Sequence, residues 1–167
     1  MKPIALFAAA LTLGASLAVA TASSAQNAGQ IASVRNGANC PRCNLFQADL
    51  TNLELKNKNL AGARLRQADF STAIMNRTSF AGGDLRDVNA YGAVLTGASF
   101  ARADLTNASF VGAYLQGANF AAAKLSGVNF SGAEMNRAIG LTQSQLNQAC
   151  GDDSTLTPRG LSIPRCR

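Results

Sequence analysis

Histidine and tryptophan are absent from this chain of 167 residues, and only 14% of its residues are charged. Without histidine, the chain has no Ser-His or Cys-His nucleophile pair and no histidine metal ligand. It also has no glycine-rich phosphate-binding loop. We therefore expect a protein that is not an enzyme and that holds no cofactor and no metal.

The basic residues do not gather into a run, although the formal net charge is +6. A nucleic-acid-binding protein normally concentrates its lysines and arginines in a patch. The even distribution along the chain predicts a mixed, solvated surface and no nucleic-acid partner.

Residues 1–25 have the three-part layout of a secretory signal peptide, with a positive start, the apolar run 4–20 and then small residues. The small-x-small rule allows cleavage after Ala20, Ala22 or Ala25, and Ala25 is favoured. The alternative is an uncleaved membrane anchor. No later segment is long and apolar enough to span a bilayer. We therefore expect a periplasmic or secreted protein with no membrane span after cleavage.

A large apolar residue recurs at every fifth position from Leu45 to Met135, and only Ala90 is undersized. A small residue, usually alanine, stands two positions before each of these centres, and Asp, Asn or Ser often stands directly before it. Glycine or asparagine recurs two positions after it. Nineteen such units run without a break over residues 43–137, and the unit 103–107 shows the whole motif as Ala-Asp-Leu-Thr-Asn.

A period of five fits neither an α-helix nor a flat strand, so the chain must turn a corner every five residues. Four sides close a coil of twenty residues, whose backbone hydrogen bonds run between stacked coils about 4.8 Å apart. Centres twenty residues apart then lie on one wall and should resemble one another. Positions 45, 65, 85, 105 and 125 are all leucine, and positions 80, 100 and 120 are all phenylalanine. Part of this is a Leu/Phe alternation with a period of ten, which a four-sided coil also satisfies.

The pattern resembles the pentapeptide-repeat family, whose motif is A-(D/N)-L-x-x, over 95 residues. The resemblance implies an all-β fold, a right-handed quadrilateral β-helix with the alanine and the central Leu or Phe inside. Departures from the motif at the alanine position include Leu53, Lys58, Thr78, Gly83 and Val88. Lys58 is the costliest inward residue unless its amine escapes past the first coils to solvent. We therefore expect the early coils to be less regular.

Both ends of the repeat are predicted to be capped, because exposed coil edges would polymerise. Residues 26–39 are expected to form a flexible N-terminal segment, residues 40–139 the β-helix, and residues 140–167 a C-terminal helix and a disulfide-tied cap. Residues 142–145 form a capping box, which predicts a short helix closed by Gly151. The remaining tail is too rich in proline and glycine for regular structure.

Four cysteines in an exported chain indicate disulfides. Of the three possible pairings, Cys40 with Cys43 and Cys150 with Cys166 is favoured. The alternative is that Cys40 and Cys43 form a redox-active CxxC motif. Redox CxxC motifs sit at a helix N-terminus, whereas this one precedes a β-helix and occupies inward register positions, so a structural role is favoured.

One wall departs from the motif on its outer side. Ile74, Val94 and Tyr114 stand directly before their centres, where the motif prefers Asp or Asn, and Glu54 and Glu134 stand at the ends of the row. An exposed apolar row is a candidate interface for a protein partner or a homodimer. The alternative is that these are ordinary single apolar residues on a surface.

Three classes of function compete. A non-catalytic exported scaffold or protein–protein interaction module is favoured, with its partner unspecified. The alternative is a periplasmic thiol-disulfide redox protein that uses Cys40 and Cys43. DNA mimicry, known in pentapeptide-repeat proteins that protect DNA gyrase, is least favoured because those proteins are acidic and cytoplasmic, whereas this chain is basic.

Overall fold

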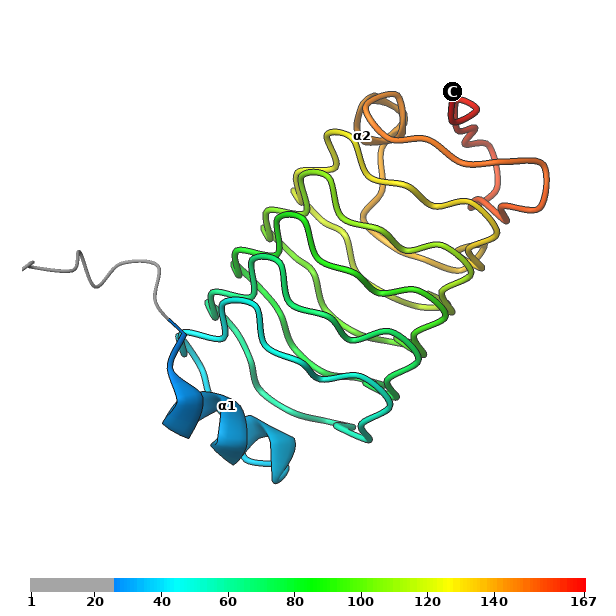
Figure 1. The fold of residues 1–167 in the computed structure, drawn as a ribbon. Helices are drawn as coiled ribbons and strands as arrows, with labels where there is room; N and C mark the ends of the chain where they lie inside the picture. The colour runs from blue at the N-terminus through cyan, green and yellow to red at the C-terminus, as the bar shows by residue number, and fades with distance from the viewer. Residues whose placement is uncertain (1–25) are drawn as a thin grey trace, which may run out of the picture.

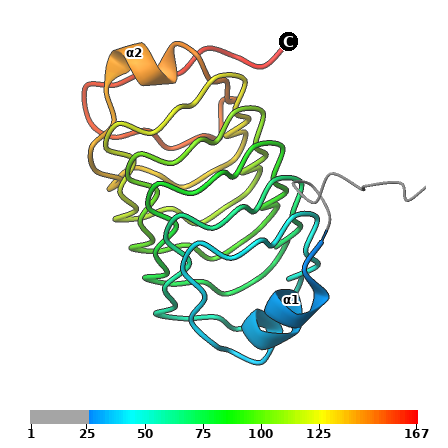
Figure 2. The same ribbon diagram turned by 90° about the vertical axis from the view of Figure 1, so that its left-hand side faces the viewer.

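The computed structural model describes residues 26–167 as a stack of four-sided coils with a helix at each end (Figure 1). Helix α1 (Ala28–Arg35) lies at the N-terminal end and helix α2 (Gln143–Leu146) at the C-terminal end. The view turned by 90° shows the same stack between the two helices (Figure 2). The predicted signal peptide, residues 1–25, lies outside the described residues.

Each coil is twenty residues long. Parallel β-bridges join residues twenty positions apart, for example Ile74 with Val94 and Val94 with Tyr114. The backbone hydrogen bonds follow the same register, since the N–H of Leu95 donates to the carbonyl of Tyr114 at 2.8 Å. Each side of a coil contributes one bridge residue, so the sheet on each wall is built from isolated parallel bridges. The four-sided coil predicted from the sequence is confirmed.

The four walls are named here by their outward residues, in the order in which the chain passes through them. The charged wall has the centres 45, 65, 85, 105 and 125, and the polar wall has the centres 50, 70, 90, 110 and 130. The stripe wall has the centres 55, 75, 95, 115 and 135, and the alanine wall has the centres 60, 80, 100 and 120.

The core consists of the central residue of each unit and the small residue two positions before it, and nearly all of these are buried. On the alanine wall, Phe80, Phe100 and Phe120 stack with successive ring centroids 5.2 Å apart. Phe110 of the polar wall meets Phe100 edge-on, at 79°. Such stacked and edge-on ring pairs stabilise beyond the area that they bury. The core is therefore a continuous apolar column through the stack.

The corners explain the polar positions of the motif. The residue two positions after each centre from 40 to 130 has a positive φ, which favours glycine and asparagine. The residue directly before the centre closes the turn: Asp104 Oδ1 accepts the backbone N–H of Thr106 at 3.1 Å. The same bond is accepted by Asp49, Asn59, Asp69, Asn89, Asn119 and Asn129.

The segment 26–39 was expected to be flexible, but it forms α1 and covers the first coil. Val34 is fully buried and Ile31 packs against the core. The backbone N–H of Asn44 has no coil before it to donate to, and it donates instead to Gln30 Oε1 at 2.7 Å. Helix α1 thus satisfies an edge that would otherwise be open.

Helix α1 was not predicted from the sequence, because few of its residues face the coils. The helix is short and its apolar residues do not recur at helical spacing, so the sequence pattern does not predict a helix here. Its one local signal is Asn27, the N-cap, whose side chain accepts the N–H of Gln30 at 3.0 Å. After the helix, Asn39 Oδ1 accepts the N–H of Asn59 at 2.7 Å, so this segment replaces part of a missing coil.

Lys58 leaves the interior at the N-terminal end. It is half-buried, and a Cβ placed on Gly37 would lie 3.6 Å from its Nζ. One coil further on, Thr78 is fully buried, and its hydroxyl donates to the carbonyl of Leu55 at 2.6 Å. The first coils have the same positive-φ corners as the later ones. The expectation of less regular early coils is therefore wrong, because both polar side chains find partners or solvent.

Helix α2 opens with the predicted capping box. Thr142 Oγ1 accepts the N–H of Gln145, and Gln145 Oε1 accepts the N–H of Thr142 at 2.9 Å. The helix ends at Leu146, however, and not at Gly151. It is this short because the chain returns at once to the coil register, where the N–H of Cys150 donates to a carbonyl of the preceding coil.

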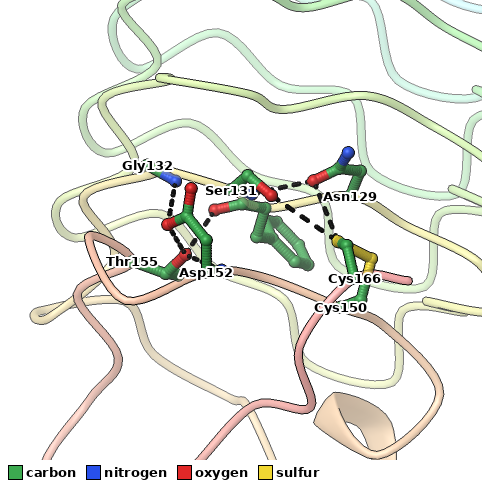
Figure 3. Close-up of a disulfide and its surroundings, with 8 residues drawn as sticks. Asn129, Ser131, Gly132, Cys150, Asp152, Thr155 and Cys166 are labelled. Carbon is green, nitrogen blue, oxygen red and sulfur yellow. Dashed lines mark hydrogen bonds between the residues drawn. A yellow bond between two sulfur atoms is a disulfide. The ribbon is translucent and has the colours of Figure 1, made fainter.

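The tail adds a partial coil, whereas an irregular tail was expected. Cys150 bridges Asn129, and Leu156 bridges Glu134, so the tail pairs with the last coil although its spacing is one or two residues longer than in the repeats. The Cys150–Cys166 disulfide ties the end of the chain to this partial coil (Figure 3). Proline and glycine therefore interrupt the tail without removing its pairing to the last coil.

Asp152 fastens the tail to the last corner. Its Oδ1 accepts the hydroxyl of Ser154 at 2.7 Å. The same atom accepts the backbone N–H of Gly132 at 2.9 Å (Figure 3). These hydrogen bonds, that from Ser154 first, lower the pKa of Asp152 to about 2. The charged carboxylate is thus the form that holds the cap.

Candidate interaction surface

Ile74, Val94 and Tyr114 lie one above another on the outer side of the stripe wall, joined in succession by parallel bridges. We call these three residues the apolar stripe. Ile74 and Val94 are half-buried, and Tyr114 is 45% exposed. The structure therefore brings together on one face the three residues singled out from the sequence.

At Val94 the apolar side chain cannot make the hydrogen bond with which Asp and Asn close corners elsewhere in the repeats. Val94 has no acceptor for the N–H of Thr96, which donates instead to Asn76 Oδ1 of the preceding coil at 3.1 Å. The inward neighbours of Val94 remain alanine and leucine as elsewhere. Folding would be served at least as well by Asp or Asn at this position, so the fold does not explain the apolar residue.

On both sides of Val94 and Tyr114, the corners of the stripe wall have no side chains. The four corners beside Val94 and Tyr114 are glycines, namely Gly92, Gly97, Gly112 and Gly117. These corners carry no side chain that could cover the stripe. At its ends, Glu54 pairs with Lys56 at 2.7 Å and Glu134 accepts the amide of Gln116 at 2.8 Å.

Two further apolar residues extend this face around the corner toward the polar wall. Tyr91 is 57% exposed, and Val111 stands at the same corner one coil later, where its carbonyl accepts the N–H of Gly92 at 2.9 Å. Neither residue was predicted from the sequence, because only the residues directly before the centres were sorted by wall. Sorting the residues directly after the centres by wall would have found them. Leu156, 47% exposed, follows Glu134 on the stripe wall.

The charged wall has the opposite outer surface. Arg86 donates two hydrogen bonds to Asp84, from Nε at 2.7 Å and from its terminal nitrogen at 2.8 Å. The bond from Arg86 holds the pKa of Asp84 below its usual value. One coil further on, Lys124 Nζ lies 3.3 Å from Asp104 Oδ2. These partly exposed pairs each contribute little to stability.

The structure joins Cys40 to Cys43 and Cys150 to Cys166, the pairing favoured from the sequence. Cys43 is buried in the first coil, and Cys40 packs at the edge of the core. The pair follows α1 and closes a coil corner, so it lacks the helix N-terminus that lowers the thiol pKa in redox motifs.

The two disulfides are typical of a protein outside the reducing cytosol. Within residues 26–167, no helix is long and apolar enough to cross a membrane. In the same part of the chain, no three His, Cys, Asp or Glu side chains gather where they could hold a metal ion.

Comparison with known proteins gives one family. The family model described as pentapeptide repeats matches in eight copies, over residues 43–82, 59–89, 84–120 and 113–150. A search of the curated proteins found no match.

Several solved structures are similar to this chain. A pentapeptide repeat protein from the thylakoid lumen of Arabidopsis thaliana is 37% identical, with a TM-score of 0.32; the match covers 53% of this chain and 55% of that one. Rfr23 from the cyanobacterium Cyanothece is 24% identical, with a TM-score of 0.30 and coverage of 72% and 85%. HetL from the cyanobacterium Nostoc, involved in heterocyst differentiation regulation, is 23% identical, with a TM-score of 0.35 and coverage of 77% and 60%. The chain thus spans about half the length of the Arabidopsis protein.

Proposed function

The chain belongs to the pentapeptide-repeat family, and we propose that it is an exported, non-catalytic module that binds a protein partner through the apolar stripe. Family membership also supports the right-handed sense expected for the coil. The observation that carries the proposal is the replacement of corner-closing polar residues by Ile74, Val94 and Tyr114 in three successive coils.

The replacement favours a functional cause. A single exposed apolar residue needs no explanation on a protein surface. Here three occupy equivalent positions on neighbouring coils, and the turn at Val94 has lost its own hydrogen bond. Bare glycine corners leave Val94 and Tyr114 accessible. Tyr91 and Val111 widen the same face. Aromatic and branched apolar side chains in a cluster are typical of the centre of a protein interface.

The stripe fits a partner that lays apolar side chains along the axis of the solenoid. It extends over three coils, about 10 Å from first to last at the coil spacing. A stable homodimer usually buries about 800 Å² on each subunit, which is more than such a narrow row supplies. We therefore favour a different protein, bound weakly or transiently, over a second copy of this chain.

Export is the second half of the proposal. The signal-peptide layout of residues 1–25 and the two disulfides support a periplasmic or secreted protein. N-terminal sequencing of the protein recovered from the periplasm or the medium should begin at Gln26. A chain that keeps its first residues and stays with the membrane would show an anchor instead.

A photo-crosslinking amino acid at position 114 tests the binding surface in intact cells. We expect a discrete crosslinked product whose mass is not twice that of the protein. The same amino acid at position 119, on the adjacent alanine wall, is the control and should give no such product. A product at twice the mass would identify a homodimer, and identical patterns at both positions would reject the stripe as an interface.

The triple variant Ile74→Asn, Val94→Asn, Tyr114→Asn separates binding from folding. Asparagine closes the same turn on other walls, so the variant should fold with an unchanged or higher thermal midpoint, yet lose the crosslinked product. A product of unchanged yield would contradict the proposal.

A further inference from the structure

The charged residues look evenly spread along the chain, but the acidic ones of the repeat region avoid one of the four walls. All seven carboxylates of the repeat region lie on the charged, polar and stripe walls or at the corner between the first two. They are Asp49, Glu54, Asp69, Asp84, Asp87, Asp104 and Glu134. The alanine wall with its two corners, which comprises residues 56–62, 76–82, 96–102, 116–122 and 136–142, contains no acidic residue.

Four exposed arginines border this wall. Arg42 and Arg102 stand at one corner, and Arg77 and Arg137 at the other. Within residues 26–167, none of the four guanidinium groups makes an ion pair or a side-chain hydrogen bond, in contrast to Arg86 on the charged wall. The two arginines of each corner are three coils apart, about 14 Å at the coil spacing.

Each corner also holds a groove that contains one of these arginines. The Arg42 side chain lies along Gly62, where an added Cβ would come within 3.2 Å of its Cγ. The groove there has a volume of about 560 Å³. At the other corner, Arg77 lies along Gly97, with a corresponding distance of 3.3 Å, and the groove measures about 310 Å³. The glycine corners therefore let both side chains lie along the surface at the rim of the alanine wall.

The middle of the wall is a row of small hydrogen-bonding side chains. Asn59, Ser79, Ser99 and Asn119 follow one another through parallel bridges, about 4.8 Å apart. Asn59 and Asn119 use their Oδ1 atoms in the turns, which leaves their amide groups as donors. The residues directly after the centres are all alanine from 61 to 121. The result is a smooth strip of donors between two rows of positive charge.

We propose that the alanine wall binds an extended carboxylated polysaccharide, laid along the solenoid axis with its carboxylates near the four arginines. Arginine pairs with carboxylates through planar, charge-assisted hydrogen bonds, and the central Ser and Asn groups suit sugar hydroxyls. The binding surface is separate from the apolar stripe, so the two proposals stand or fall independently.

Other anionic partners fit this wall less well. A peptide strand finds no backbone partner, because the wall's own groups pair from coil to coil, as the Leu60 N–H does with the Ser79 carbonyl at 2.8 Å. A protein would lack an aromatic or apolar anchoring pocket. An anionic membrane would meet one large exposed apolar side chain on this wall within residues 26–167, Ile139 at its C-terminal end, and one such residue offers little to enter the lipid.

Affinity electrophoresis through gels that contain polygalacturonate tests the proposal with the purified protein. We expect retardation that weakens as salt is raised, and none in gels with neutral dextran. The variant Arg42→Gln, Arg77→Gln, Arg102→Gln, Arg137→Gln should bind about tenfold more weakly or worse, since each exposed ion pair contributes a few-fold. The control removes four cations elsewhere, by Arg64→Gln, Arg66→Gln, Arg86→Gln and Lys124→Gln, and should stay within about threefold of the wild type. Equal losses in both variants would overturn the proposal, because they would show attraction by net charge alone.

A matched pair of single substitutions tests the centre of the wall without disturbing the fold. Ser99 and Ser109 both stand in the sequence Ala-Ser-Phe, but on opposite walls. Aspartate is the residue found at this position elsewhere in the repeats, so both Ser99→Asp and Ser109→Asp should fold. Ser99→Asp should weaken polygalacturonate binding several-fold and Ser109→Asp should not. Equal effects, or tighter binding of poly-glutamate or of phosphatidylglycerol vesicles than of polygalacturonate, would reject the polysaccharide.

Discussion

The charged wall and the stripe wall have the same inner surface and opposite outer surfaces. Both turn leucine or methionine centres and mostly small residues inward, all in one core. Outside, Asp84 and Asp104 close turns and pair with cations, whereas Val94 and Tyr114 do neither. The inner positions are therefore dictated by the fold, and the outer position before each centre can change at the cost of about one hydrogen bond. Residues other than Asp or Asn at that outer position are therefore the best guide to function.

Substitutions at the inner positions should have the largest effect on the free energy of unfolding, and the effect should be equal on the two walls. Leu95 of the stripe wall and Leu105 of the charged wall are both fully buried. Replacing either with alanine should lower the free energy of unfolding by about 2–5 kcal/mol, through lost burial and the cavity left behind. Denaturant unfolding of the two variants should agree within about 1 kcal/mol. A much smaller loss on the stripe wall would mean that the two walls do not share one core.

An intermediate effect is expected at the outer position of the charged wall. Asp104 accepts the N–H of Thr106 at 3.1 Å and its hydroxyl at 2.6 Å, and it pairs with Lys124. Asp104→Ala should lower the free energy of unfolding by about 1 kcal/mol, the usual contribution of such bonds. The matched variant Val94→Ala removes no hydrogen bond and should change it by less than half as much. Equal losses would show that the turn bond contributes nothing.

A small gain in stability is expected when a stripe residue is replaced by the asparagine that stands before centres on other walls. Val94→Asn offers the N–H of Thr96 an acceptor in its own turn, as Asn119 does for Ala121 at 2.9 Å, in place of Asn76 Oδ1 of the preceding coil. The free energy of unfolding should rise by up to about 1 kcal/mol in denaturant titrations. A loss of stability would show that Val94 is there for packing, and it would remove the main support for a binding role of the stripe.

The sequence predicts the repeated part of this molecule well because one period controls it. Twenty-residue spacing places Ile74 below Val94 without any knowledge of contacts, since a coil of fixed length has only one register. The same spacing sorts the arginines of the alanine wall, and they were missed only because charge was counted along the chain. Their segregation becomes visible once each charged residue is assigned to its wall.

The ends resist prediction because no period applies to them. Helix α1 covers the first coil with few core-facing residues, Val34 and Ile31 among them, too few to give a helical pattern. The tail contains proline and glycine, yet Cys150 and Leu156 pair with the last coil because that coil offers open backbone groups. In both places the need to cover an edge decides the structure, and that need arises only once the stack exists.

The smallest predicted effect is a pH dependence confined to the charged wall. The bond from Arg86 holds the pKa of Asp84 below its usual value of 3.8, so the folded state binds the proton of Asp84 less readily than the unfolded state. Its contribution to stability is therefore present above about pH 4 and is lost as the pH falls through the lowered pKa. The difference in free energy of unfolding between wild type and Asp84→Asn should be a few tenths of a kcal/mol at neutral pH, because the pair is partly exposed, and should shrink as the pH falls below about 4. The Val94→Asn difference, measured in parallel, should not change over the same range, since neither side chain titrates; a matching decline there would place the acid sensitivity elsewhere, with the Asp152 contacts of the cap as the next candidate.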